Sequence, residues 1–124
     1  MNALSLKLPV SLPRVWLLLA AFLLPQLVSA GQFYTPIPAT AAVGTSISGF
    51  WAGSVGTTAG ITAYSQVKAP GSSTWTTVGS GVSTHYGAAY VSYSFTYTTP
   101  GTWEFRIYVP STGSAFDYRT TVVY

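Results

Sequence analysis

Residues 88–98 read AAYVSYSFTYT, and from Val91 onward two kinds of side chain alternate without a break. Apolar or aromatic residues stand at every second position, and serine or threonine stands between them. A period of two predicts a β-strand with one buried side and one side that faces solvent. We therefore expect a strand here with inward side chains at Val91, Tyr93, Phe95 and Tyr97.

The same alternation recurs on both sides of this stretch, between turns that contain proline and glycine. No segment after residue 30 shows the period of an amphipathic helix. Further strands are expected at residues 45–54, 61–69, 74–78, 103–109 and 115–124, with an edge strand or extended arm at residues 31–42. Seven short strands at this spacing predict an all-β fold, a seven-stranded antiparallel β-sandwich.

The last two expected strands form a hairpin around the turn at residues 110–113. If the numbers of facing residues sum to 223, Arg106 faces Asp117 and Glu104 faces Arg119, so both pairs are complementary in charge. A register shifted by two residues would place the two arginines opposite each other. We predict the first register, with both carboxylates on the solvent side. The alternation then predicts inward side chains in the last strand at Phe116, Tyr118, Val122 and Tyr124.

Residues 1–30 have the three parts of a secretory signal peptide. Lys7 and Arg14 supply a basic start, residues 15–24 are apolar, and small residues precede the expected cleavage site after Ala30. An uncleaved membrane anchor is the alternative, but a span needs about 20 apolar residues and this run is interrupted near half that length. The sequence therefore favours export.

The chain is expected to divide into a signal peptide (1–30), an extended N-terminal arm or edge strand (31–42) and a β-sandwich domain (43–124). After cleavage the product would be secreted, to the periplasm, the cell surface or the medium, with no further membrane contact. Small exported domains often use disulfides to supplement a thin core, but this chain has no cysteine. That combination suits a bacterial exported protein that relies on packing alone.

The formal net charge of the whole chain is +3, but much of it belongs to the expected signal peptide. Beyond residue 30, Lys68, Arg106 and Arg119 stand against Glu104 and Asp117, which leaves a net side-chain charge of +1. Binding to a phosphate backbone needs a dense group of cations. We therefore expect no nucleic-acid partner.

The inventory of catalytic groups is nearly empty. His85 is the one histidine, no Gly-x-Ser-x-Gly motif occurs, and one histidine with two carboxylates cannot complete a tetrahedral zinc site. A glycosidase pair made by Glu104 and Asp117 is the alternative, but both are expected on a solvent face beside arginines, where a general acid lacks an enclosed site. The sequence predicts a protein that is not an enzyme and has no cofactor and no metal.

Trp51, the stretch YSQV at residues 64–67 and the stretch PGTWEFRI at residues 100–107 make the chain resemble a fibronectin type III or bacterial immunoglobulin-like domain. In those families an aromatic residue of the second strand packs against the third strand, and a Pro-Gly-Thr turn leads into a strand that begins with an aromatic residue. Trp103 stands one residue earlier than the usual tyrosine of the fibronectin pattern. The resemblance implies a binding, spacing or assembly module and implies no reaction.

Several aromatic and apolar residues fall outside the expected core and could contact a partner or brace their cross-strand neighbours. The candidate interface residues are Phe33, Tyr34, Ile37, Phe50, Tyr64, Trp75, Tyr90 and Tyr108. A surface with few charges and many rings gives little repulsion between copies. We therefore expect a non-catalytic structural subunit that associates with itself or with another surface protein, with the arm at residues 31–42 adding a strand to a neighbour.

The alternative is a carbohydrate-binding module in which Tyr64, Trp75 and Tyr108 form a stacking platform for a polysaccharide. A third interpretation, a small secreted enzyme, would require a pocket that brings His85 to a carboxylate.

Overall fold

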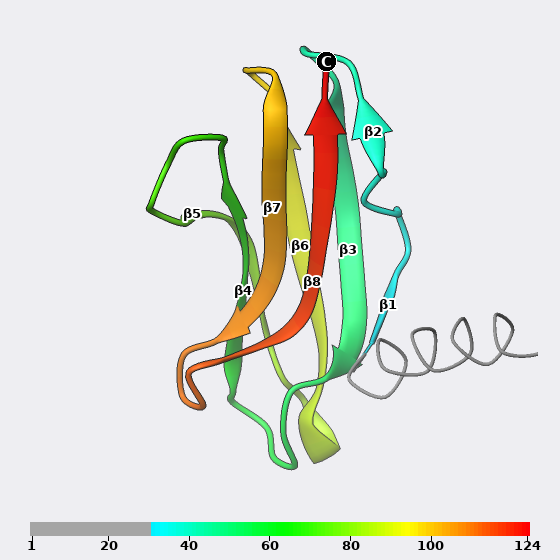
Figure 1. The fold of residues 1–124 in the computed structure, drawn as a ribbon. Coiled ribbons are helices and arrows are strands. Elements are labelled where there is room, and N and C mark those ends of the chain that lie inside the picture. Colours follow the sequence, from blue (N-terminus) through cyan, green and yellow to red (C-terminus); the bar gives the residue numbers. More distant parts are fainter. Residues whose placement is uncertain (1–30) are drawn as a thin grey trace, which may run out of the picture.

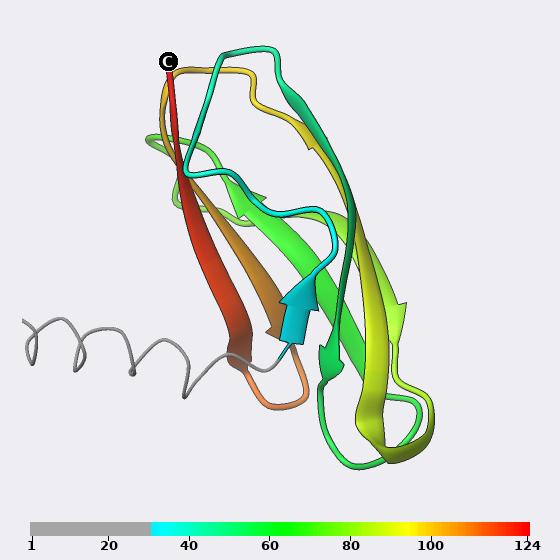
Figure 2. The same cartoon turned by 90° about the vertical axis from the view of Figure 1, so that its right-hand side faces the viewer.

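The alternating segments form two β-sheets that face each other across an apolar interior, as a computed structural model shows (Figures 1 and 2). The structure describes residues 31–124. The expected signal peptide lies outside the described residues. Within them the fold is all-β, as the alternation predicted, and the one helical turn is the 3₁₀ turn η1 (His85–Gly87).

The two sheets contain three and five strands. The smaller sheet has the order β1-β3-β6 and consists of β1 (Gly31–Phe33), β3 (Ser46–Ser54) and β6 (Ala88–Thr96). The larger sheet has the order β2-β8-β7-β4-β5 and consists of β2 (Thr40–Ala41), β4 (Thr62–Lys68), β5 (Thr76–Val82), β7 (Gly101–Val109) and β8 (Ser114–Val123). In Figure 2 the two layers are seen from the side.

The segment at residues 31–42 belongs to both sheets, which corrects the prediction of a single edge strand or arm. β1 pairs antiparallel with β3, and β2 pairs parallel with β8, so the described residues contain eight strands and one pairing that is not antiparallel. Pro36 and Pro38 lie between the two short strands, where their missing N–H groups and fixed φ prevent continuous pairing. The segment thus begins in the smaller sheet and ends in the larger one (Figure 1).

The core is formed by alternate residues of four strands. Val91, Tyr93 and Tyr97 are buried and Phe95 is partly buried, as expected for β6 and its extension. The inward residues of the other three strands include Ile47, Trp51, Ala63, Val67, Trp103, Phe105, Ile107 and Val109. Tyr93 meets Phe105 edge to face at 5.2 Å between ring centroids, which joins the two layers through aromatic contact.

The predicted register of the final hairpin holds only beside the turn. There Tyr108 faces Ala115, but a β-bulge follows, and Ile107 then faces Asp117 and Phe105 faces Arg119. The predicted pairs of Arg106 with Asp117 and of Glu104 with Arg119 are therefore wrong. An extra residue on one strand shifts every later partner by one position and exchanges the two faces of the strand.

The bulge turns Asp117 into the core and not towards solvent. Asp117 is buried, whereas Tyr118, Val122 and Tyr124 are exposed, the reverse of the prediction at these positions. Phe116 is partly buried and packs against the core, as predicted. The physical compensation is specific, because the Trp51 Nε1–H donates to Asp117 Oδ2 at 3.0 Å and Arg119 forms an ion pair with the same carboxylate.

Hydrogen bonds also connect the layers elsewhere. The hydroxyls of Tyr97 and Thr121 lie 2.8 Å apart, and the Thr121 hydroxyl donates to the Pro38 carbonyl at 2.6 Å. The Tyr93 hydroxyl donates to the carbonyl of Thr35. Every buried side-chain nitrogen and oxygen of the described residues has a hydrogen-bond partner. Two of these bonds fasten the segment between β1 and β2 to the core.

Alkaline conditions are expected to destabilise the fold through Tyr93 and Tyr97. Burial raises the pKa of both phenols above the ordinary value of 10.0, because the interior disfavours the phenolate. An unfolded chain therefore loses these protons at a lower pH than the folded chain, so the free energy of unfolding falls as the pH rises above 10.0. Urea unfolding followed across that range, with phenolate absorbance measured in parallel, checks this; a flat profile would contradict it.

Candidate functional site

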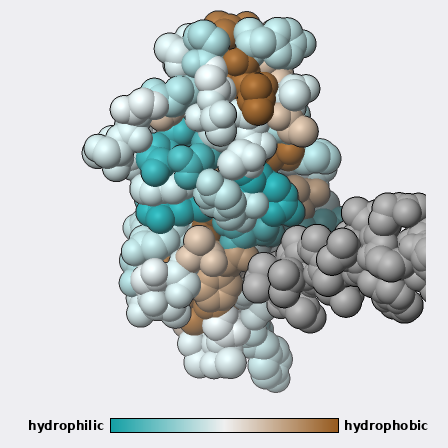
Figure 3. Space-filling model, viewed as in Figure 1, coloured by the Kyte–Doolittle hydropathy of each residue, from teal (hydrophilic) through white to brown (hydrophobic). Residues whose placement is uncertain are grey.

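Charge is confined to one of the two sheets. The five charged side chains of the described residues are Lys68 in β4, Glu104 and Arg106 in β7, and Asp117 and Arg119 in β8. The strands of the three-stranded sheet contain none. Figure 3 views the molecule from the side of the larger sheet and shows hydrophilic residues gathered in a band across it. The two outer faces therefore offer different chemistry to a partner.

An aromatic cluster lies on the outer face of the smaller sheet, and we call Tyr34, Phe50, Tyr90 and Ser92 the aromatic surface. Phe50 pairs with Ser92, and the following outward position of β6 towards its start is Tyr90, so their side chains are diagonal neighbours. Tyr34 follows β1, and its N–H donates to the Phe50 carbonyl at 3.0 Å. The sheet pairing thus places three rings from three separate segments side by side.

The rings of the aromatic surface contact one another edge to face. The ring centroids of Tyr34 and Phe50 are 4.6 Å apart, and those of Phe50 and Tyr90 are 5.6 Å apart. Tyr34 is 53% exposed, Phe50 39% and Tyr90 67%, and together with Ser92 they line an open hollow of about 560 Å³. Exposed hydroxyls continue the face, and Ser46 and Thr96 lie 2.7 Å apart across the two strands.

A second aromatic group lies on the larger sheet and holds a cation. The Arg106 guanidinium carbon lies 4.1 Å from the ring centroid of Trp75 and 4.1 Å from that of Tyr108. The Arg106 Nε–H donates to Gln66 Oε1 at 2.8 Å. We call Trp75, Arg106 and Tyr108 the Arg106 stack. Tyr64 is the cross-strand partner of Tyr108, so its side chain stands beside the stack.

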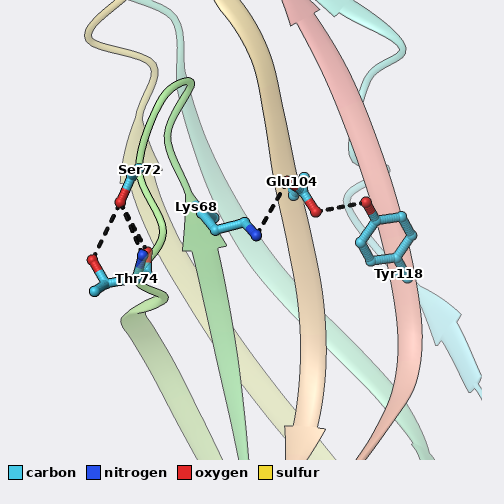
Figure 4. Close-up of polar contacts among 5 residues, drawn as sticks. All are labelled: Lys68, Ser72, Thr74, Glu104 and Tyr118. Carbon is cyan, nitrogen blue, oxygen red and sulfur yellow. Dashed lines mark hydrogen bonds and ion pairs between the residues drawn. The ribbon is translucent and has the colours of Figure 1, made fainter.

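The remaining charges on this outer face form a short chain of polar contacts (Figure 4). Lys68 Nζ lies 3.5 Å from Glu104 Oε2, and the Tyr118 hydroxyl donates to Glu104 Oε1 at 2.8 Å. That hydrogen bond to a carboxylate raises the pKa of the Tyr118 phenol. The turn before β5 adds hydroxyls, because Ser72 bonds to Thr74 in the same view. The Glu104 carboxylate thus has two partners on this face, Lys68 and Tyr118.

The predicted interface residues fall into three groups. Tyr34, Phe50 and Tyr90 gather on the smaller sheet, and Tyr64, Trp75 and Tyr108 gather on the larger one. Phe33 and Ile37 are partly buried and pack against the core, which corrects their placement on an outer surface. Arg119 covers Phe33, with its guanidinium carbon 4.8 Å from the ring centroid.

Two members of these sites, Ser92 and Arg106, were not among the predicted interface residues. The alternation places Ser92 and Arg106 on outer faces, but it gives no sign of which rings lie beside them. Trp75 stands in the irregular segment between β4 and β5, and the conformation of that segment decides that its ring covers Arg106.

The groups considered for catalysis are not brought together. Glu104 lies on the outer face with Lys68, whereas Asp117 is buried behind the same sheet. His85 is exposed in η1, beside Tyr86. Within residues 31–124, no group of three or more His, Cys, Asp or Glu side chains has the spacing of a metal site.

Comparison with family models, curated proteins and solved structures gave no match to this chain. None of the helical structure in residues 31–124 is long and apolar enough to cross a bilayer.

Proposed function

We propose that this chain is a secreted, non-catalytic β-sandwich with immunoglobulin-like architecture that self-associates as a structural subunit at the cell surface or outside the cell. The observation that carries the proposal is the aromatic surface: three exposed rings on a sheet whose strands contain no charged residue. The basic and apolar segment at residues 1–30 supports secretion.

The strand order supports the immunoglobulin-like assignment. The order β8-β7-β4-β5 corresponds to strands G, F, C and C′, and β1-β3-β6 corresponds to A, B and E. At the start of β7, the Trp103 Nε1–H donates to the Thr99 carbonyl at 2.8 Å, a bond that corresponds to the tyrosine corner of such domains. The Trp51–Asp117 hydrogen bond joins the two sheets in a chain that lacks the usual disulfide.

A second copy of the chain is the partner that this surface fits best. Association of two aromatic surfaces removes apolar rings from water and desolvates no charge, because neither copy has one on these strands. A two-fold axis would bring identical surfaces together, the usual arrangement of homodimers. The segment at residues 31–42 supplies Tyr34 to this surface, and its two short strands pair with β3 and β8 of their own chain.

Self-association is expected to weaken when polar residues replace the exposed rings. Phe50→Ser and Tyr90→Ser should each raise the dimer dissociation constant by about tenfold or more, since central aromatic residues dominate interface energies. The protein is produced from the full chain, recovered after export, checked by mass spectrometry for a start at Gly31, and studied by analytical ultracentrifugation over a range of concentrations.

Tyr124→Ser is the matched control, because it removes another exposed tyrosine (74%, against 67% for Tyr90) outside the aromatic surface and should leave association unchanged. A protein that stays monomeric at every concentration would refute the proposal. Equal association of all three variants would place the interface elsewhere. Binding of another surface protein, with no homodimer, would refute the choice of partner.

The three rings that a carbohydrate-binding module would use, Tyr64, Trp75 and Tyr108, lie together on the larger sheet, with Arg106 against two of them. Arg106 covers one face of Trp75 and one face of Tyr108, so the predicted stacking platform for a polysaccharide also contains a cation. The ligand chemistry of that face must include this charge.

A further inference from the structure

Arg106 is the one cationic side chain of the described residues whose charge has no carboxylate partner. Glu104 accepts from Tyr118 and pairs with Lys68, while Asp117 accepts from Trp51 and pairs with Arg119. Arg106 bonds only to the neutral amide oxygen of Gln66. The net side-chain charge of +1 beyond residue 30 is therefore located at the Arg106 stack.

The Arg106 guanidinium is held in place before any ligand arrives. Trp75 and Tyr108 lie against it at 4.1 Å each, and the bond from Nε to Gln66 fixes its rotation. A guanidinium has five N–H donors, and only one of them has a protein acceptor here. The loss of entropy on binding an anion is accordingly smaller than for a free arginine.

Partial burial sharpens the effect of this unpaired charge. Desolvation lowers the pKa of Arg106, so the surroundings already withdraw part of the water that would stabilise the cation. A negatively charged group bound to the free N–H donors restores that stabilisation, and it does so at a dielectric below that of bulk water. Lys68 Nζ also lies 5.0 Å from the Trp75 centroid, with its carboxylate partner Glu104 at 3.5 Å.

We propose that the Arg106 stack binds a carboxylated sugar, the uronic acid residue of an acidic polysaccharide. The two η nitrogens match the two oxygens of a carboxylate in a bidentate pair. The ring of Tyr64 and the faces of Trp75 and Tyr108 that Arg106 does not cover offer apolar surface to the sugar. The Thr77 hydroxyl lies beside Gln66 in the same row of the sheet.

A phosphodiester chain fits this face less well. Its affinity comes from many cations arranged along the backbone, and here only Lys68 and Arg106 lie together. This proposal does not rest on self-association, because the Arg106 stack and the aromatic surface belong to different sheets.

The test is a calorimetric titration of the exported protein with oligogalacturonate and oligomannuronate, with a malto-oligosaccharide of equal length as the uncharged probe and oligoglutamate as a carboxylated peptide. We expect binding of at least one uronate, weaker binding at higher salt, and no measurable heat from the uncharged sugar. Arg106→Gln should weaken uronate binding by about tenfold or more, and Arg106→Lys, which keeps the charge but loses the planar fork, should weaken it by a smaller factor.

Phe50→Ser is the control, since it alters the opposite sheet and should leave uronate affinity unchanged while it reduces self-association. Circular dichroism establishes that each variant is folded. If Arg106→Gln does not fold, Arg106→Lys alone tests the role of the guanidinium. No binding of either uronate, equal binding of the uncharged sugar, or unchanged affinity in the Arg106 variants would overturn the proposal. Oligoglutamate binding as tight as uronate binding would overturn the choice of a sugar.

Discussion

Replacing Trp51 by alanine is expected to lower the free energy of unfolding by about 4 kcal/mol, close to the whole stability of many domains of this size. The Trp51 side chain is fully buried between the sheets, so its removal leaves a large cavity. It also removes the N–H donor of Asp117, whose carboxylate lies in the same interior. Urea unfolding monitored by circular dichroism measures the change.

Two milder variants separate the hydrogen bond from the cavity. Trp51→Phe keeps an aromatic ring but loses the N–H, and Asp117→Asn keeps the shape but loses the charge; each should cost about 1–3 kcal/mol. The double variant should cost less than the sum, because the two residues share one bond. A cost for Trp51→Ala below about 1 kcal/mol, or strictly additive single variants, would show that this link between the sheets contributes little.

The core was predictable where a strand follows a strict period of two. In β6 and β7 one side of the strand faces the other sheet along its whole length, so every second residue is apolar and the pattern identifies the inward side. In β8 the same rule gives the wrong face, because the bulge that follows the turn shifts the alternation by one residue. The sequence contains no separate signal for that bulge, and the buried Asp117 is the consequence that the pattern missed.

The candidate sites were predictable to a similar extent. Phe50 and Tyr90 were correctly placed on an outer face by the period of their strands. Their contact depends on which strands are neighbours, and the contact of Trp75 with Arg106 depends on the path of a loop. Sequence periodicity indicates the side of a strand, but it contains no information about the partner across a sheet or above it.

The close contact between β5 of the larger sheet and β6 of the smaller sheet depends on Gly79, which the sequence pattern placed in a loop. Gly79 lies within β5, which extends to residue 82 and past the predicted end at residue 78. Glycine is a poor strand former, so the pattern ended there. In the structure a Cβ at Gly79 would overlap the carbonyl oxygen of Ser92 in β6, and it would lie 2.7 Å from the Ser65 hydroxyl.

Gly79→Ala is therefore expected to lower the free energy of unfolding by about 3 kcal/mol, because the overlap is with backbone and β6 as a whole must move. The shift would also break the 2.6 Å hydrogen bond from the Ser65 hydroxyl to the Ser92 carbonyl. Gly79 does not have a positive φ, so the cost comes from crowding and not from backbone strain. Since β6 carries Tyr90 and Ser92, the same variant should weaken self-association as well.

Ser80→Ala is the matched control, since Ser80 is the next residue of β5 and its side chain is exposed. It should change the free energy of unfolding by less than about 0.5 kcal/mol, as expected for a surface substitution. Urea unfolding measures both variants, and ultracentrifugation compares their association at concentrations where each is folded. If Gly79→Ala were as stable as Ser80→Ala, the close contact between β5 and β6 would be wrong. If Gly79→Ala were destabilised yet associated normally, β6 would tolerate the shift, and the aromatic surface would not depend on the close contact between β5 and β6.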